Sequence, residues 1–328
     1  MATKIRWGIL ATGWIAELFV KDLQLTGHVV AAVGSRSQAS ADRFATMFGI
    51  AKAHGSYEAL AADPDVDIIY IATPHPQHAA AARLALNAGK HILVEKAFTL
   101  NAVEAAEIVR LGASKGLVVL EAMWTRFLPH MRRIREIIAA GTIGEIRSVT
   151  ADHRQKLPDD PKHRLNALEL GGGALLDLGI YPISFTWDML GKPTSIKASA
   201  TFRETGADAQ VATVFHYASG AIATTLSSSD SAGPNRASVV GTKGRIDIDR
   251  VWYSPTTFRV YDNANTVLET FDAPVSGRGM QFQADEAERL IASAQTESDI
   301  MPPTQSLQIM QVLDEVRNQI GLRYPGER

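Results

Sequence analysis

The segment Ile5-Arg6-Trp7-Gly8-Ile9-Leu10-Ala11-Thr12-Gly13-Trp14-Ile15-Ala16 decides the fold, because an apolar run leads directly into a short turn. Ile5 to Leu10 predicts a buried strand. Gly13 and Ala16 stand at the last two positions of the pattern G-x-G-x-x-G/A, which joins a strand to a helix around the pyrophosphate of a dinucleotide. Gly13 lets the backbone approach a phosphate, and Ala16 lets the helix pack closely. We therefore expect cofactor contacts from Ala11, Thr12, Gly13, Trp14 and Ile15.

The first glycine of that pattern is missing. Ala11 occupies its position, and Gly8 lies too early in the chain to replace it. The turn must therefore form without a residue that freely tolerates a positive φ. An ordinary turn between a strand and a helix would give the same residues, so this segment alone leaves both interpretations open.

The loop after the second predicted strand, Val29 to Gly34, carries a cation where many dinucleotide sites carry an acid. The loop lies about 20 residues beyond the turn, at the offset where the acid is usually found. Its sequence is Gly34-Ser35-Arg36-Ser37, which contains no carboxylate. A guanidinium offers paired donors and positive charge to a phosphate, so Arg36 and Ser35 favour NADP over NAD. The alternative is an exposed loop arginine without a ligand.

Strands and helices then alternate, which predicts a doubly wound parallel sheet of the Rossmann type. The expected elements are a helix at 39–48, a strand at 67–72, a helix at 77–88, a strand at 91–94, a helix at 102–114 and a strand at 117–120. Ligands of such sheets bind beyond the carboxyl ends of the strands. The segments expected there are Thr73-Pro74-His75-Pro76, Glu95-Lys96-Ala97 and Glu121-Ala122-Met123-Trp124.

Two histidines of this region allow a second interpretation. His75 and His78 could be metal ligands, because imidazole nitrogen is a common ligand of zinc. No third ligand is evident beside them, and Pro76 interrupts the spacing. We therefore interpret both histidines as cofactor contacts or helix caps, and we expect no metal site.

The sequence pattern changes near Met123, where an N-terminal domain (1–123) is expected to end and a second domain (124–328) to begin. After a helix at 131–140, short segments that alternate or run apolar predict an α+β domain with a large, mostly antiparallel, open-faced sheet. The strands are expected at 146–153, 195–202, 209–216, 221–227, 236–240, 245–248, 257–261 and 267–271. Helices are expected at 281–293 and 306–320, and residues 321–328 should be loosely held.

The segment Gly171-Gly172-Gly173-Ala174-Leu175-Leu176-Asp177-Leu178-Gly179-Ile180-Tyr181 places two reactive side chains on one predicted helix. Asp177 and Tyr181 are four residues apart, so an α-helix would present both on one face. The glycines before them allow a close approach to a ligand or to a neighbouring strand. The alternative is a solvated Asp177, a Tyr181 that covers an apolar seam, and a flexible glycine loop.

The composition limits the class of ligand and the compartment. The chain has 328 residues, of which 46% are apolar, enough for about two domains. Its formal net charge of −2 argues against nucleic acid as a partner, and the lack of cysteine excludes disulfides, thiolate nucleophiles and thiolate metal sites. No signal-peptide core or bilayer-length apolar run occurs, so we expect a soluble, cytoplasmic protein that binds a small molecule and no membrane.

Taken in order, the motifs of the chain resemble those of the glucose-fructose oxidoreductase/inositol dehydrogenase (Gfo/Idh/MocA) family. The segments that carry the resemblance are Ala11-Thr12-Gly13, Ile71-Ala72-Thr73-Pro74, Val94-Glu95-Lys96, Glu121-Ala122-Met123-Trp124-Thr125-Arg126-Phe127 and Gly171 to Tyr181. It covers nearly the whole chain and is greatest for the branch with dimeric dihydrodiol dehydrogenase, NADP-dependent xylose dehydrogenase and glucose-fructose oxidoreductase. Ala97 replaces a family proline, Ala11 replaces a glycine, and many relatives have histidine in place of Tyr181.

The resemblance implies an NADP(H)-dependent oxidoreductase that transfers a hydride to or from a secondary carbinol or carbonyl of a sugar, polyol or cyclic trans-diol. It implies three catalytic residues: Tyr181 as the proton carrier, Lys96 as the cation that stabilises its phenolate, and Asp177 as a ligand of a second hydroxyl or of Lys96. Cofactor contacts are implied for Thr73, Pro74, His75, His78, Glu95, Lys96 and Arg126. Substrate contacts are implied for Lys96, Trp124, Asp177 and Tyr181, although Trp124 and Arg126 are equally compatible with packing between domains.

Two other classes of function stay open at this point. A regulatory protein that senses NADPH without turnover would need Arg36 but no proton carrier, so the presence of both Lys96 and Tyr181 argues against it. A purely structural assembly protein would leave the motifs of the first domain unexplained.

The family resemblance also suggests a homodimer or a larger homo-oligomer, formed through the outer face of the C-terminal sheet. Successive residues of a strand point to opposite faces. Thr213, Phe215 and Tyr217 are therefore expected on one face of their strand, and Val214 and His216 on the other.

Overall fold

The computed structural model describes residues 4–327, and the chain forms two compact units. Unit 1 contains the residues up to Trp124 together with Val275–Met310, whereas unit 2 contains Thr125–Pro274 and the residues from Gln311 onward. The sequence pattern predicts Val275–Met310 as part of the second domain, but this segment belongs to the first compact unit because it packs with the residues of that unit.

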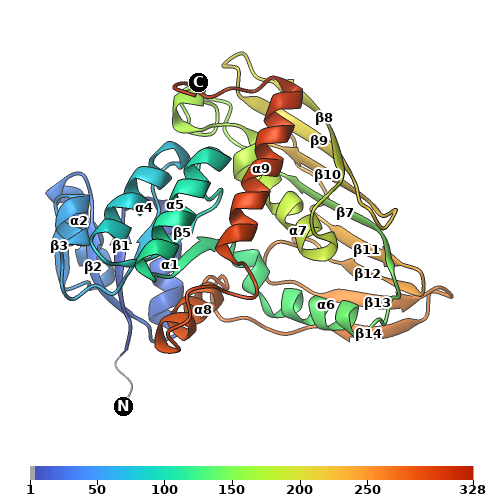
Figure 1. The fold of residues 1–328 in the computed structure, drawn as a ribbon, viewed down its shortest axis with the longest axis horizontal. Coiled ribbons are helices and arrows are strands. Elements are labelled where there is room, and N and C mark those ends of the chain that lie inside the picture. The colour runs from blue at the N-terminus through green and yellow to red at the C-terminus, as the bar shows by residue number, and fades with distance from the viewer. Residues whose placement is uncertain (1–3, 328) are drawn as a thin grey trace. The chain divides into compact units, whose positions relative to one another are not determined.

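Unit 1 is built on a six-stranded parallel sheet with the strand order β3-β2-β1-β4-β5-β6 (Figure 1). Its strands are β1 (Arg6–Leu10), β2 (Val29–Gly34), β3 (Lys52–His54), β4 (Ile68–Ile71), β5 (His91–Glu95) and β6 (Val119–Ala122). All neighbouring strands run parallel. The Rossmann-type sheet predicted from the sequence is therefore confirmed, and the strand order reverses between β1 and β4, where such sheets bind their ligands.

The helices of unit 1 follow the strands in the expected alternation. They are α1 (Trp14–Leu25), α2 (Gln38–Phe48), α3 (Tyr57–Ala61), α4 (His78–Asn87), α5 (Ala102–Lys115) and α8 (Gln281–Ala292), and α9 (Pro303–Ile320) begins in this unit. β3 and α3 were not expected from the sequence. Both elements are too short to show a clear hydrophobic period, which explains why the sequence pattern missed them.

The segment Val275–Met310, which follows the first part of unit 2 in the chain and belongs to unit 1, is held against α1 and the start of β2 by buried polar groups. The carboxylate of Asp22 accepts the backbone N–H groups of Arg278 (2.9 Å) and Met280 (2.8 Å). His28 contacts Glu288 through Nδ1 (2.7 Å) and Asp285 through Nε2 (3.2 Å). Burial alone would lower the pKa of His28, but hydrogen bonds to the two carboxylates raise it to about 9. His28 is therefore a protonated link between the loop before β2 and α8 at neutral pH.

Unit 2 is built on an eight-stranded sheet with the order β14-β13-β12-β11-β7-β10-β9-β8. Its strands are β7 (Ile146–Arg154), β8 (Ser195–Phe202), β9 (Asp208–His216), β10 (Ile222–Ser228), β11 (Ala237–Gly241), β12 (Gly244–Ile248), β13 (Phe258–Asp262) and β14 (Val267–Phe271). β7 and β10 are parallel, and the other neighbours are antiparallel. The mostly antiparallel sheet predicted from the sequence is confirmed.

One face of this sheet is covered by α6 (Pro129–Ala139) and α7 (Ile180–Leu190), as Figure 1 shows. The side chains of β9 alternate accordingly. Thr213 and Phe215 are buried, and so is Tyr217 just beyond the strand, whereas Val214 is half-buried and His216 is exposed. The expected division of these residues between two faces is confirmed, and the outer face meets solvent in the single chain.

The C-terminal residues are held more firmly than the sequence suggested. Leu322 and Tyr324 are buried, and the Tyr324 hydroxyl donates to the carbonyl oxygen of Gly172 (3.1 Å). Arg317 of α9 forms an ion pair with Glu327 (2.7 Å). These contacts correct the expectation of a loosely held end for residues 321–327, and Arg328 lies outside the described residues.

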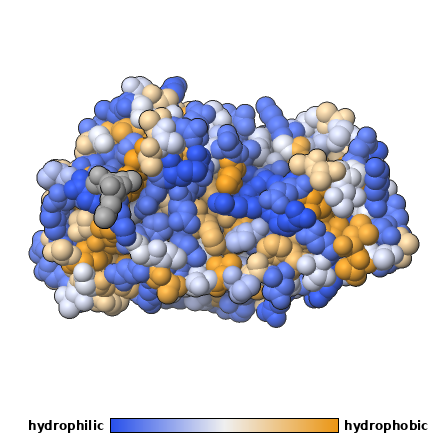
Figure 2. All heavy atoms as spheres, turned by 90° about the horizontal axis from the view of Figure 1, so that it is seen from below, coloured by the Kyte–Doolittle hydropathy of each residue, from blue (hydrophilic) through white to orange (hydrophobic). Residues whose placement is uncertain are grey.

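Within residues 4–327, none of the helices combines the length and the apolar character needed to cross a bilayer. The face shown in Figure 2 is largely hydrophilic, with apolar residues scattered over it. The chain also exposes a few large apolar side chains, among them Trp14, which is 63% exposed at the start of α1.

Candidate active site

The turn between β1 and α1 presents backbone groups to a ligand. Ala11 adopts a φ of 83°, so it takes the conformation for which glycine is usually needed. Gly13 is the N-cap of α1 and provides no side-chain cap to the first helical turn. A Cβ added at Gly13 would meet no atom within 4 Å. The space beside Gly13 is therefore open, and the first N–H groups of a helix, which lack intrahelical partners, can bind a phosphate there.

The loop after β2 presents the cation that the sequence singled out. Ser35 is buried, whereas Arg36 is exposed and forms no ion pair within residues 4–327. Burial raises the pKa of Tyr57 in α3, and the nearby charge of Arg36 opposes this increase. Ser37 serves as the N-cap of α2, because its side chain accepts the backbone N–H of Ser40 (3.2 Å). Arg36 is thus an uncompensated cation at the carboxyl end of β2.

Two histidines position the backbone that carries Lys96. His78 is buried, and its two ring nitrogens lie 3.0 Å from the carbonyl oxygen of Ala97 and 2.8 Å from that of Thr73. His75 Nε2 lies 3.2 Å from the carbonyl oxygen of Lys96. Burial lowers the pKa of His78, which favours the neutral ring. Both histidines therefore have an internal positioning role, and their contact with a cofactor stays a prediction.

The remaining predicted residues of unit 1 lie at the same edge of the sheet. Lys96 follows β5 and is half-buried, and its peptide bond to Ala97 is cis. Glu95 is buried and accepts a hydrogen bond from Tyr70 of β4. Trp124 is buried just after β6. Because β4, β5 and β6 are neighbouring parallel strands, their carboxyl ends bring these side chains to one edge.

Three features of this edge fit a dinucleotide cofactor. The open space at Gly13 suits a pyrophosphate, and Arg36 has charge available for a further phosphate. Thr73, beyond the end of β4 and beside Pro74, has a buried hydroxyl with no hydrogen-bond partner among the described residues. A buried hydroxyl without a partner is costly, so a ligand atom at this position would satisfy it.

In unit 2, the glycine-rich turn and the helix after it are held by a buried carboxylate. Asp208 at the start of β9 is fully buried, and its Oδ2 accepts the backbone N–H of Leu175 (2.6 Å). Gly173 lies directly over this carboxylate with φ of 130°, and a Cβ there would collide with it. Burial raises the pKa of Asp208 to about 6, although backbone hydrogen bonds oppose the shift. The glycines therefore serve a close approach to a neighbouring strand, one of the two roles expected for them.

The helix that follows differs from the regular α-helix that the sequence predicted. Asp177 lies in a π-helical turn (Leu175–Gly179), and Tyr181 lies in the first turn of α7. A π turn is wider than an α turn, so residues five apart stack better than residues four apart, and such turns are frequent at functional sites. Asp177 and Tyr181 are only 9% and 8% exposed, so the interpretation of Asp177 as a solvated residue is wrong.

Tyr181 belongs to a cluster of polar aromatic rings. The ring of His153, at the end of β7, meets Tyr181 edge-on at 4.9 Å and stacks on Tyr253 at 3.7 Å. Tyr181 and Tyr253 lie 5.4 Å apart. Gln155 approaches both partners, with its amide nitrogen 2.8 Å from His153 Nε2 and 3.3 Å from the Tyr253 hydroxyl. The phenol of Tyr181 is therefore fixed among groups that can exchange hydrogen bonds.

Two arginines of unit 2 bind aspartates. Arg164 approaches Asp177, with Nη1 3.4 Å from its Oδ1, and is half exposed. Arg126 is buried, pairs with Asp188 of α7 (2.9 Å) and donates to the carbonyl oxygen of Ser184 (2.8 Å). The sequence predicted a cofactor contact for Arg126, whereas these bonds give its guanidinium a role in holding α7.

The two halves of the chain match models of one protein family. Residues 5–123 match the oxidoreductase family with an NAD-binding Rossmann fold, and residues 131–247 match the GFO/IDH/MocA C-terminal domain. The chain belongs to the Gfo/Idh/MocA oxidoreductase family. The resemblance stated from the sequence motifs is therefore confirmed, and this family member is a dehydrogenase or reductase.

Several relatives match this Gfo/Idh/MocA chain over nearly its full length. A trans-1,2-dihydrobenzene-1,2-diol dehydrogenase of Mus musculus is 37% identical over 337 residues, with 99% of each chain covered. A D-xylose 1-dehydrogenase (NADP(+)) of Hypocrea jecorina is 35% identical over 365 residues, covering 98% of this chain and 93% of the relative.

Solved structures share the fold. A 3-ketoreductase from Actinomadura kijaniata in complex with NADP and TDP-benzene is 26% identical, with a TM-score of 0.85 over 97% of this chain and 98% of the other. An aldose-aldose oxidoreductase from Caulobacter crescentus is 23% identical, with a TM-score of 0.87 over 97% of each chain, and its likeness concerns the fold alone.

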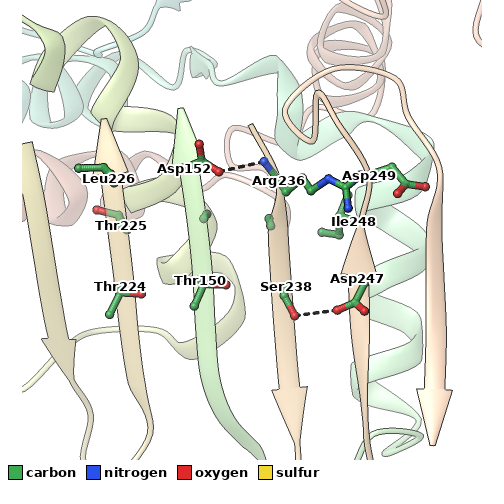
Figure 3. Close-up of a pocket in the computed structure, with 12 residues that line it drawn as sticks. Thr150, Asp152, Thr224, Thr225, Leu226, Arg236, Ser238, Asp247, Ile248 and Asp249 are labelled. Atoms are coloured by element: carbon green, nitrogen blue, oxygen red, sulfur yellow. Dashed lines mark hydrogen bonds between the residues drawn. The ribbon is translucent and has the colours of Figure 1, made fainter. Parts of the chain in front are cut away.

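A hollow of about 390 Å³ on the eight-stranded sheet (Figure 3) is lined by none of the predicted catalytic residues of this family member. Its lining includes Thr150, Thr224, Ser238 and Asp247, and Ser238 donates a hydrogen bond to Asp247 (3.0 Å). Polar and apolar side chains line the hollow, which is formed by β7, β10, β11 and β12 and by residues directly beside them. Elsewhere too, residues 4–327 contain no group of three histidine, aspartate or glutamate side chains placed to hold a metal ion.

Proposed function

We propose that the chain is an NADP(H)-dependent oxidoreductase that acts on a CH–OH group of a sugar, polyol or cyclic trans-diol. The observation that carries the proposal is the helix segment of unit 2 that holds Asp177 and Tyr181 in a buried polar cluster, within a family of dinucleotide-dependent oxidoreductases. The relatives named above act on a trans-dihydrodiol and on D-xylose. Both compounds carry neighbouring hydroxyl groups.

The cofactor preference rests on Arg36. A nicotinamide dinucleotide supplies the hydride chemistry when it is bound, and the protein binds and orients it. The N–H groups after Gly13 would hold the pyrophosphate, and the buried hydroxyl of Thr73 would give the cofactor a further contact. Arg36 would pair with the 2′-phosphate that distinguishes NADP from NAD. NADP is also the cofactor in the printed names of the xylose dehydrogenase and of the 3-ketoreductase complex.

Tyr181 is the proposed proton carrier. Hydride can leave a secondary carbinol only as its hydroxyl proton is removed, and a phenol with a reference pKa of ~10 is a weak base at neutral pH. Lys96 supplies the cation that stabilises the phenolate, so both residues act in one proton-transfer step. The ammonium group of Lys96 also donates a hydrogen bond to the substrate oxygen, which fixes the reacting carbon for hydride transfer.

The surroundings of Tyr181 favour a substrate rich in hydroxyl groups. Asp177, with Arg164 beside it, offers a carboxylate acceptor for a second hydroxyl. His153 and Tyr253 stack on each other beside Tyr181, and their ring nitrogen and hydroxyl groups add polar groups that a substrate rich in hydroxyls could bind. An arene diol carries fewer hydroxyls and would satisfy fewer of these polar groups.

We also propose that the protein is cytoplasmic and forms a homodimer or a larger assembly through the outer face of the eight-stranded sheet. That face carries Thr150, Thr224, Val214 and His216, and it meets solvent in the single chain. Sedimentation at micromolar concentration measures the assembly, and a stable monomer would contradict this part of the proposal.

A substrate screen tests the function. Pentoses, hexoses, anhydro-sugars and trans-dihydrodiols would be supplied with NADP⁺, and NADPH formation would be followed by its absorbance; the matching carbonyl compounds would be supplied with NADPH. We expect turnover of at least one cyclic polyol and a higher kcat/KM with NADP(H) than with NAD(H). Tight NADPH binding without turnover of any compound would instead support a catalytically silent NADPH sensor.

A further inference from the structure

A second arginine of unit 1 stands beside the start of α1. Arg278 belongs to the loop before α8, and its guanidinium carbon lies 5.6 Å from the ring centre of Trp14 and 5.1 Å from that of Trp124. Both distances lie within the range over which an aromatic face attracts a guanidinium. Trp14 is the first residue of α1. The cation therefore lies near the side chain of the first residue of α1, the helix whose start the dinucleotide pattern assigns to a pyrophosphate.

The backbone of Arg278 is fixed from behind. The buried Asp22 in α1 accepts the N–H groups of Arg278 and Met280. Gly277 and Gly279, on either side, have φ values of 70° and 95°, and a Cβ on Gly277 would collide with the Asp22 carboxylate. These contacts fix the loop, so the position of the guanidinium does not depend on the two indole rings alone.

The charge of Arg278 is not compensated within the described residues. The side chain is exposed, and no carboxylate of residues 4–327 forms an ion pair with it. The N-terminus of a helix carries partial positive charge, so a cation beside it is unfavourable unless an anion lies nearby. The arrangement becomes favourable when a phosphate binds at the start of α1, because the helix end and the guanidinium then share one anion.

We propose that Arg278 binds the pyrophosphate of the dinucleotide, held in place by Trp14 and Trp124. This inference rests on the proposed function and assigns different parts of the cofactor to two arginines. Arg36 would recognise the 2′-phosphate, which only NADP carries, and so set the preference between cofactors. Arg278 would bind the part that NADP and NAD share, and so set the affinity for both.

Dissociation constants of NADPH and NADH test this division. We expect Arg278→Met to weaken both cofactors by a similar factor, about 10- to 100-fold for the loss of a charge-assisted contact. Arg36→Ala should weaken NADPH alone. Arg278→Lys should recover only part of the affinity, because an ammonium group lacks the planar fork that stacks and binds bidentately. Arg110→Met is the matched control, since Arg110 is exposed on α5 and the same charge is lost.

Cofactor fragments make the test independent of catalysis. ADP contains a pyrophosphate, whereas 2′-AMP contains the 2′-phosphate alone, and both can be measured as competitors of NADPH. Arg278→Met should weaken ADP and leave 2′-AMP unchanged, and Arg36→Ala should do the reverse.

Several results would overturn the inference. They are wild-type affinity of Arg278→Met for both cofactors, a loss confined to NADPH, and unchanged cofactor binding with an increased KM for the substrate. Binding of neither cofactor by the wild-type protein would reject the proposed function and this inference together, which separates that failure from the others.

Discussion

The cofactor edge of unit 1 and the aromatic cluster of unit 2 are built in different ways. At the cofactor edge, the groups proposed to meet the ligand are backbone N–H groups after Gly13 and exposed cations such as Arg36. In unit 2 they are side chains that are buried and packed on one another, with Tyr181 against the stacked rings of His153 and Tyr253. Substitutions at the cofactor edge should therefore change cofactor affinity by amounts that add. Substitutions in the aromatic cluster should change turnover and stability together, by amounts that do not add.

The largest effect is expected from the proton carrier of unit 2 and its cation. Tyr181→Phe should leave cofactor affinity nearly intact and lower kcat by about 10²- to 10⁴-fold, the usual contribution of a positioned proton carrier. Lys96→Met should lower kcat at least as much and also increase KM, because it removes both the cation and a substrate contact. Asp177→Asn should cause a smaller loss, mainly in substrate binding. Steady-state kinetics on the best substrate of the screen measure these effects.

The double variant sharpens this prediction. Residues that act in one step are strongly non-additive, so Lys96→Met with Tyr181→Phe should be little worse than Lys96→Met alone. Losses that multiply would mean that the two residues act independently. Near-wild-type kcat for Tyr181→Phe would show that the proton leaves by another route.

The next effect concerns the stability of the turn that leads to Asp177 and Tyr181. Burial raises the pKa of Asp208 from its ordinary 3.8 to about 6. The folded state therefore favours the protonated carboxyl; this contribution is complete only below the ordinary pKa of 3.8 and is lost as the pH rises from there through about 6. We expect the free energy of unfolding to decrease by about 3 kcal/mol over this interval on account of Asp208.

Asp208→Asn isolates that contribution. The amide oxygen can still accept the backbone N–H of Leu175, but the side chain no longer titrates. Urea unfolding at pH 4, 5, 6 and 7 should show a flatter profile than wild type, with the variant relatively more stable at pH 7 than at pH 4. Asp272→Asn is the control, because Asp272 is exposed in the same unit. An unchanged slope for Asp208→Asn would assign the pH dependence to other groups.

A smaller effect is expected from the exposed cation of unit 1. Arg36→Ala should lower the preference for NADP over NAD by about 1.5 to 3 kcal/mol, because one charge-assisted contact with the 2′-phosphate is lost. The ratio of kcat/KM for the two cofactors measures it, and kcat/KM with NAD should hardly change. A wild-type enzyme that prefers NAD would reject the role of Arg36.

The difference between the cofactor edge and the aromatic cluster also explains which features could be predicted from the sequence. The cofactor edge follows from local patterns: an apolar strand, Gly13 and Ala16 at a fixed spacing, and Arg36 at a fixed offset, all within one alternating run of strands and helices. These features depend on neighbours in the chain, so they were predicted with nearly correct bounds. β3 and α3 were missed because both are short.

The cluster in unit 2 depends on residues that are distant in the chain, and most of it was not predicted. Tyr181 and Asp177 were found from their spacing and the family resemblance, but His153, Arg164 and Tyr253 were not. His153 stands at the end of a predicted strand, which is the only local signal it offers. The approach of Asp208 to the glycine turn and the return of Val275–Met310 to unit 1 follow from tertiary packing.

The smallest effect is expected at the turn before Gly13, where the backbone rather than a side chain faces the cofactor. Ala11 has a φ of 83°, a conformation that costs a residue with a Cβ about 1 kcal/mol or more. Ala11→Gly should remove this strain, and the larger conformational entropy of unfolded glycine should cancel only part of the gain. We expect a net stabilisation of roughly 0.5 to 1 kcal/mol with unchanged NADPH affinity, because the N–H groups keep their positions. Thermal unfolding with and without NADPH measures both quantities.

Ala16→Gly is the matched control, since Ala16 is buried within α1, where glycine should destabilise by about 1 kcal/mol. Destabilisation by Ala11→Gly of a similar size would mean that Ala11 is not strained and that the turn is made in another way.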